Sequence, residues 1–395
     1  MIIKPKARGF ICTTAHPEGC YANVKEQIDY LSKKEKINGP KKVLIIGSST
    51  GYGMSSRIST AFSSDASTIG VFFEKPSNGR STASPGWYNT AAFEKLAHEQ
   101  NLYAKSINGD AFSDQIKNET IDLIKKDLGK IDLLIYSLAA PRKTNYKTGE
   151  KYNSVLKPIG NVYSNKAVDF NTKVVSEVTV EPATEKEISD TVEVMGGNDW
   201  KLWIEKLKAA DVLSEKFVTL AYSYIGSDIT YPLYTKGTIG RAKDHLLETV
   251  PKIDQIIKDL DGKSYISVNK ALITQASSAI PVIPLYISIL YKIMKDKNTH
   301  EGCIEQCYRL FKDKLYKENV CVDELGRIRL DDWELEEDVQ TKVRELWEKA
   351  TTENIKTLTD INGYSSEFFK LFGFGLNNID YEKDIDPIVD IPSIK

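Results

Sequence analysis

Lys41-Lys-Val-Leu-Ile-Ile46 runs directly into Gly47-Ser-Ser-Thr-Gly51-Tyr-Gly53, and this stretch decides the fold. The apolar run predicts a short strand that is buried on both faces, as at the centre of a parallel sheet. Residues 54–62 are typical of a helix, so strand, glycine turn and helix follow in the order that a dinucleotide-binding motif needs. The glycines let the backbone approach a diphosphate, and the helix N-terminus offers it free N–H groups. We therefore predict a nicotinamide-cofactor site here; the alternative is an ordinary glycine-rich turn.

Glu74 is a candidate for recognising the cofactor's ribose. A second apolar run, 68–73, ends just before it, roughly 20 residues beyond Gly53. An acidic side chain at this place accepts hydrogen bonds from the adenosine ribose and repels a 2′-phosphate. We therefore expect NADH in preference to NADPH, although Lys75 and Arg80 lie close by in the sequence. The alternative is a solvated glutamate.

Strand-like and helix-like segments alternate along much of the chain. Further strands are predicted at 103–107, 131–136, 217–222 and 265–268, with helices at 90–101, 114–128 and 245–260. The alternation is typical of an α/β protein with a Rossmann-type, doubly wound parallel sheet. Ligands of such sheets bind beyond the carboxyl ends of the strands. Asp110-Ala111, Ser137-Leu-Ala-Ala140 and Leu272-Ile-Thr274 follow strands, so we expect them near the cofactor, with a plain loop as the alternative for each.

Two regions depart from this alternation. Residues 143–194 change to short β-like pieces at 154–156, 173–175 and 176–180, which predicts an insertion near 143–200 with a β-hairpin overhanging the site. A helix is expected to open at Asn198. The last hundred or so residues are helical and charged in pattern, with 331–338 as an acidic face, and should form a scaffold around the sheet. We see no repeat and no long linker, so residues 1–395 are expected to form a single catalytic domain.

Tyr234 and Lys243 are the candidate catalytic pair, separated by Thr235-Lys-Gly-Thr-Ile-Gly-Arg-Ala242. Beside a nicotinamide, a tyrosine and a lysine can polarise a carbonyl while a hydride is transferred. On an unbroken helix, nine steps of roughly 100° would place the two side chains on opposite faces. They converge only if Tyr234 lies on a loop and Lys243 on the helix that follows, which Pro232 and Gly237 allow. The alternative is a surface tyrosine and a solvated helical lysine.

Composition excludes several classes of protein. The chain is 41% hydrophobic and 27% charged with a formal charge of -2, which gives no reason to expect nucleic acid or a membrane as partner. The N-terminal residues lack the apolar stretch of a signal peptide. The most apolar segment, 280–294, is too short and too broken by proline to span a bilayer, so we expect a buried helix beside the active site.

The 5 cysteines are odd in number and scattered, which argues against a disulfide framework and fits a reducing cytoplasm. Cys303 and Cys307 would share a helical face, with His300 one turn earlier. Such a trio is half of a metal site, but no second ligand pair appears. We therefore expect no metal.

Four motifs in order give the chain a family resemblance: Gly47–Gly53, Val194-Met-Gly-Gly-Asn-Asp-Trp200, Ala221-Tyr-Ser-Tyr-Ile-Gly226, and Tyr234 with Lys243. Together they closely resemble the single-chain trans-2-enoyl-CoA reductases, a family that includes the FabV-type enoyl-[acyl-carrier-protein] reductases. The resemblance extends over nearly the whole chain, from residues 4–10 to 363–364. The family is an enlarged relative of the short-chain dehydrogenases, in which the lysine follows the tyrosine by only four residues.

The resemblance implies roles for individual residues. Tyr234 is implied as the catalytic acid, Tyr224 as a substrate contact, and Lys243 as both a catalytic and a cofactor-binding residue. Asp244 stands where some members carry a second lysine, which weakens any role for a second lysine here. The implied cofactor contacts are Gly47, Ser48, Ser49, Thr50, Gly51, Tyr52, Phe73, Glu74, Asp110, Ala111, Leu138, Ala139, Leu272, Ile273 and Thr274.

The implied reaction is the NADH-dependent reduction of the trans-2 double bond of an enoyl-CoA thioester, such as crotonyl-CoA to butyryl-CoA, in lipid metabolism. Hydride reaches the β carbon, negative charge grows on the carbonyl oxygen, and a hydroxyl donor aimed at that oxygen stabilises the transition state. Tyr234 would be this donor, and Lys243 would hold the nicotinamide ribose. The resemblance further implies a cytoplasmic monomer with no flavin, since the hydride passes directly from NADH.

Three other functions remain open on sequence grounds. The nearest is an enoyl-[acyl-carrier-protein] reductase of fatty acid biosynthesis, with the same reaction on a different carrier. An alcohol or ketone dehydrogenase would use the same tyrosine and lysine. A non-catalytic NADH-binding sensor would bind the cofactor without oxidising it.

Overall fold

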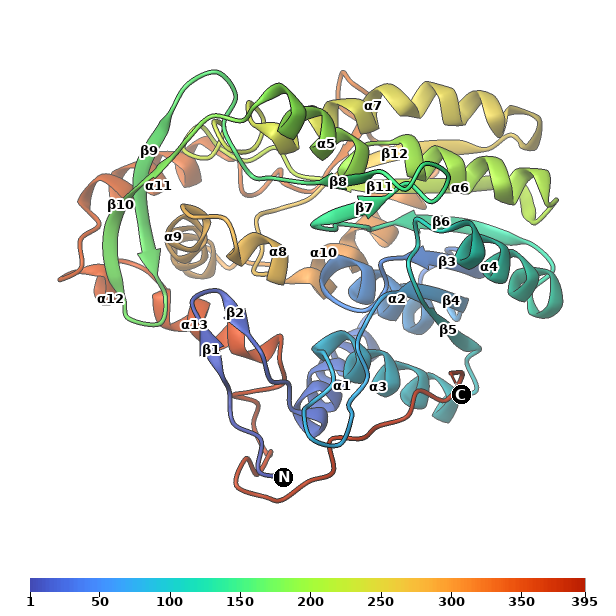
Figure 1. The fold of residues 1–395 in the computed structure, drawn as a ribbon, viewed down its shortest axis with the longest axis horizontal. Helices are drawn as coiled ribbons and strands as arrows, with labels where there is room; N and C mark the ends of the chain where they lie inside the picture. Colours follow the sequence, from blue (N-terminus) through green and yellow to red (C-terminus); the bar gives the residue numbers. More distant parts are fainter. Residues whose placement is uncertain (395) are drawn as a thin grey trace.

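A seven-stranded parallel sheet runs through the centre of the protein in the computed structural model, which describes residues 1–394 (Figure 1). In spatial order the strands are β13 (Arg327–Arg329), β12 (Lys263–Val268), β11 (Leu213–Ser223), β6 (Ile131–Tyr136), β3 (Lys42–Ile46), β4 (Ser67–Phe72) and β5 (Ala104–Asn108). The chain winds outward from β3 in one direction and returns through β6 in the other, so the crevice between these two strands is a topological switch point. The six strands expected from the sequence are confirmed.

Helices cover both faces of the sheet (Figure 1). One face carries α1 (Pro17–Ser32), α2 (Gly51–Ser64) and α3 (Pro85–Glu99), and the other carries α4 (Asp114–Asp127), α6 (Asn198–Ala209) and α7 (Thr238–Ile256). Successive residues of β3 alternate between the two cores: Val43 and Ile45 pack with the first set of helices, Leu44 and Ile46 with the second. Burial on both faces explains the unbroken apolar run and confirms the doubly wound fold.

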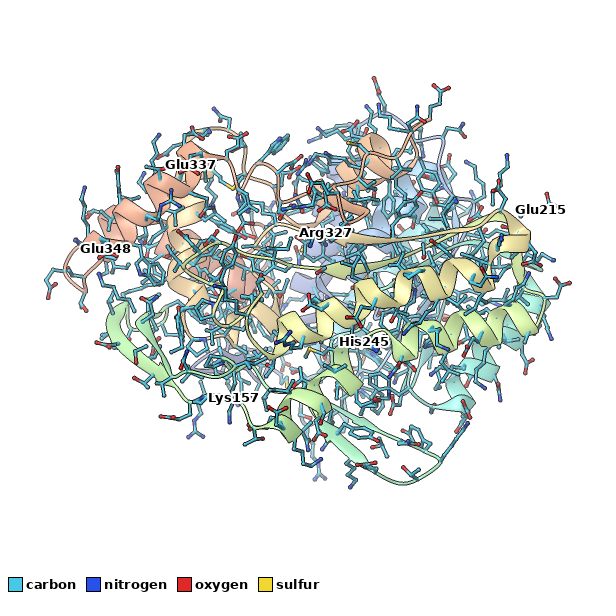
Figure 2. All side chains as sticks on the ribbon, turned by 90° about the horizontal axis from the view of Figure 1, so that it is seen from above. Lys157, Glu215, His245, Arg327, Glu337 and Glu348 are labelled. Atoms are coloured by element: carbon cyan, nitrogen blue, oxygen red, sulfur yellow. The ribbon has the colours of Figure 1, made fainter. Side chains whose placement is uncertain are left out.

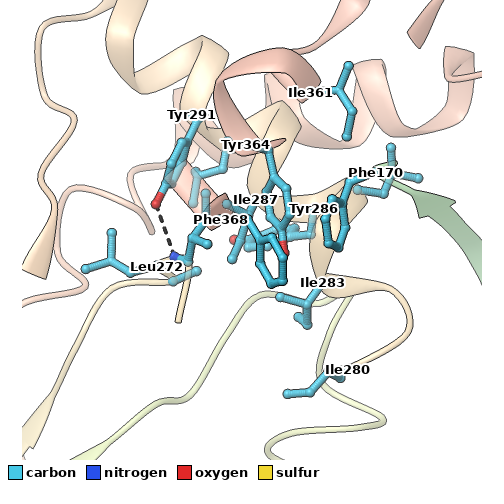
Figure 3. Close-up of a cluster of buried hydrophobic side chains, with 14 of the residues drawn as sticks. Phe170, Leu272, Ile280, Ile283, Tyr286, Ile287, Tyr291, Ile361, Tyr364 and Phe368 are labelled. Carbon is cyan, nitrogen blue, oxygen red and sulfur yellow. Dashed lines mark hydrogen bonds between the residues drawn. The ribbon is translucent and has the colours of Figure 1, made fainter. Parts of the chain in front are cut away.

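A third layer lies beyond one end of the sheet and is built around α9 (Ile283–Asp296). It contains α11 (Glu337–Lys349), α13 (Ile361–Lys370) and the hairpin of β9 (Tyr163–Asp169) and β10 (Val174–Val180). Figure 3 shows its core, in which Ile283 and Ile287 lie among aromatic side chains of the other elements. In Figure 2, α11, with Glu337 and Glu348 near its ends, lies on the opposite side of the molecule from Glu215. The buried helix expected near 280–294 is confirmed. The C-terminal helices α11 and α13 pack on this helix, α9, and not around the sheet as the sequence suggested.

The insertion differs in detail from expectation. Residues 154–156 form no strand, because the backbone and side chain of Ser154 bond to the loop after β6, at Pro141 O (2.9 Å) and Ala140 O (2.8 Å). Of the pieces expected at 173–175 and 176–180, residues 174–180 form the one strand β10, and Lys173 lies in the turn before it. Tyr163 of β9 donates its hydroxyl to Ile229 O at 2.9 Å, so the hairpin contacts the loop that carries Tyr234. The further elements are β7 (Arg142–Thr144), β8 (Lys151–Asn153), α5 (Glu185–Met195), β1 (Ala7–Arg8), β2 (Ile11–Cys12), α8 (Gln275–Ser278), α10 (Cys303–Arg309) and α12 (Ile355–Leu358).

Within residues 1–394, no helix is both long enough and apolar enough to cross a membrane.

Candidate active site

The glycine turn lies against the end of β6. Gly47 has a φ of +83°, and a Cβ at this position would lie 2.2 Å from Ser137 O. A Cβ on Gly53 would lie 1.8 Å from Gly47 O. Only glycine permits these close backbone contacts. Helix α2 begins at Gly51, three residues earlier than the sequence suggested. The N–H groups of its first turn are therefore available to an anion, so the turn fits a cofactor diphosphate.

A cavity of about 380 Å³ opens at this helix N-terminus. Thr50 and Gly51 line it from the glycine turn, and Leu272 and Thr274 line it from the loop after β12. The two loops are in contact, since Thr274 Cγ2 would lie 3.5 Å from a Cβ on Gly51. The structure thus brings together two predicted cofactor segments that are more than two hundred residues apart in the sequence.

Glu74 lies immediately beyond β4, beside the same turn. Its Oε1 accepts a hydrogen bond from Ser49 Oγ at 2.7 Å, and its backbone N–H donates to Asn108 Oδ1 at 2.8 Å. A Cβ on Gly86 would lie 2.0 Å from the same Oε1, so the lack of a side chain at Gly86 leaves room for the carboxylate in this position. Burial raises the pKa of Glu74, and hydrogen bonds from Ser84 and Ser49 oppose that rise. Glu74 is therefore an anchored acid at the place expected for a ribose contact.

The other predicted cofactor residues lie at the same edge of the sheet. Phe73 precedes Glu74 and is 76% exposed, which leaves its ring free for a flat ligand. Asp110, after β5, accepts the Tyr146 hydroxyl at 2.6 Å through Oδ2 and so joins this edge to the insertion. Tyr52 lies in the first turn of α2. The loops that follow the strands carry Ser48, Ala111, Leu138, Ala139 and Ile273.

Tyr234 and Lys243 have the loop-and-helix arrangement that their spacing requires. Tyr234 lies on the loop between β11 and α7, is 7% exposed, and has its pKa raised by burial, so the phenol is protonated at neutral pH. Lys243 lies in the second turn of α7, where its Nζ donates to Tyr222 O at 2.8 Å. Burial lowers the pKa of Lys243 to about 8. The expected placement of Tyr234 on a loop and of Lys243 on the helix that follows is confirmed.

Tyr224 packs edge-to-face on Tyr234, with ring centroids 4.6 Å apart and an interplanar angle of 80°. Its hydroxyl donates to Glu334 Oε1 at 3.0 Å. Glu334 is 0% exposed, so the prediction that 331–338 forms an acidic surface face is wrong for this residue; Asp331 is buried too, in an ion pair with Arg329. Charge pattern gave no signal for Glu334, because its partners all lie far away in the sequence.

The candidate metal ligands do not converge. Cys307 Sγ lies 3.4 Å from Ser56 Oγ, and His300 packs edge-to-face on Tyr291 with ring centroids 4.2 Å apart. Across residues 1–394, no group of three or more histidine, cysteine, aspartate and glutamate side chains is arranged to hold a metal ion.

The fold and the site together define a nicotinamide-dependent oxidoreductase of an enlarged short-chain-dehydrogenase type. They combine a doubly wound sheet with a glycine turn that fits a diphosphate, and with a buried tyrosine followed by a lysine on the next helix. A family model for the trans-2-enoyl-CoA reductase catalytic region matches residues 81–316, and one for the NAD(P)H binding domain of trans-2-enoyl-CoA reductase matches residues 2–79. The chain belongs to the trans-2-enoyl-CoA reductase family. A third model, described as an enoyl reductase FAD binding domain, matches residues 322–385.

Individual relatives agree with this membership. The chain is 61% identical to an enoyl-[acyl-carrier-protein] reductase [NADH] of Flavobacterium johnsoniae, and 56% identical to a trans-2-enoyl-CoA reductase [NADH] of Ruminiclostridium cellulolyticum; both matches cover 100% of each chain. The crystal structure of Treponema denticola trans-2-enoyl-CoA reductase in complex with NAD superposes with a TM-score of 0.95 at 47% identity, covering 99% of this chain and 100% of that one. The family resemblance predicted from the motifs is confirmed.

Proposed function

We propose that this protein uses NADH to reduce the trans-2 double bond of enoyl-CoA thioesters, with crotonyl-CoA as a representative substrate. One observation carries the proposal. Tyr234 is buried and protonated on the loop that leads into α7, Lys243 lies in the second turn of α7, and both are at the edge of the sheet where the glycine turn lies. Relatives named for the same reaction on thioesters support it.

In this proposal, bound NADH supplies the hydride that reaches the substrate's β carbon. Tyr234 donates its hydroxyl hydrogen bond to the thioester oxygen, where negative charge grows as the double bond is reduced. The raised pKa of Tyr234 keeps its proton in place until that charge appears. The resulting enolate then takes a proton at its α carbon, which completes the addition of one hydride and one proton across the double bond. Lys243 holds the nicotinamide ribose, and the glycine turn holds the diphosphate. Tyr224 contacts the acyl chain beside Tyr234.

The acyl carrier protein is the second candidate carrier, because the Flavobacterium johnsoniae relative is named for it at 61% identity. The deciding experiment follows the near-ultraviolet absorbance of NADH mixed with purified protein and crotonyl-CoA, then crotonyl-acyl-carrier protein at the same concentration. Acetoacetyl-CoA serves as a ketone substrate in parallel. We expect the fastest loss with crotonyl-CoA. Faster loss with the carrier protein would reassign the substrate, faster loss with acetoacetyl-CoA would indicate a dehydrogenase, and no loss with any thioester would overturn the proposal.

We propose that no flavin takes part, although residues 322–385 match a model described as FAD-binding. Inward-facing side chains of this segment, including Tyr364 and Phe368, pack on Phe170 of the hairpin and on α9, as a structural layer would (Figure 3). A visible absorption spectrum of the purified protein tests this, since a bound flavin would colour it yellow.

We further propose that residues 1–395 work as one catalytic domain and as a monomer in the cytoplasm. All five cysteines are free thiols, as a reducing compartment would keep them. Light scattering on the purified protein tests the monomer, and a dimeric mass would contradict it.

Replacing Glu74 by Gln should relax the preference for NADH. The amide keeps a group for Ser49 to bond but removes the negative charge that repels a 2′-phosphate. We expect the ratio of kcat/KM for NADH to that for NADPH to fall at least about tenfold, roughly the effect of 1.4 kcal/mol. Glu99→Gln, at the end of α3, is the matched control and should leave the ratio unaltered. An unaltered ratio in the Glu74 variant would remove this residue from cofactor selection.

Activity should decline at alkaline pH through Lys243. Because burial lowers its pKa to about 8 from an ordinary value of ~10.4, the side chain is charged below about pH 8 and neutral above it. kcat/KM for NADH, which reports the free enzyme, should therefore fall as pH rises through about 8. Lys243→Met should show lower kcat/KM and lack this alkaline limb. A wild-type profile that stays level to about pH 10 would contradict the assignment.

A further inference from the structure

Glu334 is a fully buried carboxylate to which the proposed reaction gives no task. It comes from the turn after β13, far along the chain from Tyr234, and is 0% exposed. Two tyrosine hydroxyls donate to its Oε1, from Tyr224 at 3.0 Å and Tyr286 at 2.7 Å. The Ala271 backbone N–H donates to Oε2 at 2.6 Å, just before the cofactor loop Leu272–Thr274. The carboxylate therefore joins the substrate side of the site to the cofactor side.

The ionised form of Glu334 matches these contacts. Burial raises its pKa, while the nearby charge of Lys270 and the Ala271 and Tyr286 hydrogen bonds oppose the rise. Lys270 is itself 2% exposed. An ionised carboxylate only accepts hydrogen bonds, and here three donors occupy its two oxygens. Both tyrosines must therefore point their protons at Glu334. The second hydrogen bond of Tyr286 agrees with this direction: its hydroxyl oxygen accepts from Gln340 Nε2 at 3.2 Å, so its own proton is free to point at Glu334.

The direction of the Tyr224 proton affects the reaction. The Tyr224 ring lies edge-to-face on Tyr234, so a substrate whose thioester oxygen reaches Tyr234 would also lie against Tyr224, a second phenol. That oxygen accepts hydrogen bonds and cannot donate them. With its proton committed to Glu334, Tyr224 offers the site only lone pairs, and Tyr234 is left as the phenolic donor.

We propose that Glu334 is a positioning residue that holds the Tyr224 proton away from the substrate, so that Tyr234 alone donates to the thioester oxygen. This inference rests on the proposed function. In this arrangement Tyr224 packs on Tyr234 and offers the substrate only hydrogen-bond-accepting lone pairs. The arrangement also accounts for the burial of a carboxylate against two tyrosine hydroxyls.

The test is Glu334→Gln in the Tyr234→Phe background. The amide can keep its oxygen on the Ala271 N–H and present its NH₂ to the tyrosine oxygens, which frees the Tyr224 proton to enter the site. We expect turnover of crotonyl-CoA at least about tenfold above that of Tyr234→Phe alone. Adding Tyr224→Phe should remove the gain. No gain, or a gain that survives Tyr224→Phe, would overturn the inference.

Asp331→Asn in the same background is the matched control. Asp331 is equally buried and lies three residues earlier, but its partner is Arg329, so we expect no gain. Thermal unfolding and NADH fluorescence titration establish that each variant folds and binds cofactor. If the glutamine variant does not fold, Tyr224→Phe alone decides: it should keep at least about ten times the turnover of Tyr234→Phe, and equal losses would overturn the inference. An inactive wild-type protein would instead count against the proposed function.

Discussion

Tyr234→Phe should fold, bind NADH as the wild type does, and lose on the order of 10²–10³ in turnover of crotonyl-CoA. The phenyl ring preserves the edge-to-face packing on Tyr224, so the substitution removes little more than the hydroxyl. That hydroxyl stabilises charge that grows only in the transition state, so the loss should fall on kcat more than on KM. Stopped-flow absorbance with saturating NADH gives kcat, and NADH fluorescence gives the cofactor affinity.

Tyr231→Phe is the matched control for this experiment. It removes the same atom from the same loop, three residues earlier, where we assign no contact with substrate or cofactor. Its turnover should remain within about twofold of the wild type, as for most substitutions away from a catalytic group. Near-normal turnover in Tyr234→Phe would show that another group protonates the developing charge.

The sequence predicts the sheet well because its central strands are buried on both faces. A strand such as β3 must then be apolar wherever both faces are covered, as it is from Val43 to Ile46, and this pattern needs no distant partner to be recognised. β13 lacks this signal: it is a three-residue edge strand in which only Ile328, between two arginines, is fully buried. At residues 154–156 a strand was predicted where none forms. Two apolar residues suggested it, but the polar groups of Ser154 bond to the loop after β6.

The candidate site divides in the same way. The glycine turn, Glu74 and the Tyr234–Lys243 pair are short-range patterns with a known chemical purpose, so spacing alone suggests them. Glu334 is different, because its Tyr224 and Ala271 partners are 110 and 63 residues away in the sequence. A glutamate among acidic neighbours is expected at the surface, since burying an unpaired carboxylate costs roughly several kcal/mol of folding free energy. Only the three-dimensional contacts that satisfy it show that the cost is offset.

Gly47→Ala should weaken NADH binding on the order of 100-fold, which is about 3 kcal/mol. Two effects combine at this position. The positive φ of +83° is unfavourable for any residue with a Cβ, by about 1–2 kcal/mol, and the Cβ would lie 2.2 Å from Ser137 O. Because the obstacle is backbone, the turn itself must move, and overpacking of this kind costs a further ~1–3 kcal/mol. Fluorescence titration with NADH measures the affinity, and thermal unfolding measures the stability.

Gly129→Ala separates the two effects. Gly129 has a similar φ of +74°, but nothing lies within 4 Å of a Cβ there, and it precedes β6 at the amino edge of the sheet, away from the cofactor. This variant should lose stability through backbone strain alone and bind NADH normally. Gly47→Ala should lose more stability and, because the displaced turn no longer aims the N–H groups of α2 at the diphosphate, should also lose affinity. If both variants bound NADH equally well, the close approach of Gly47 to β6 would have no part in holding the cofactor.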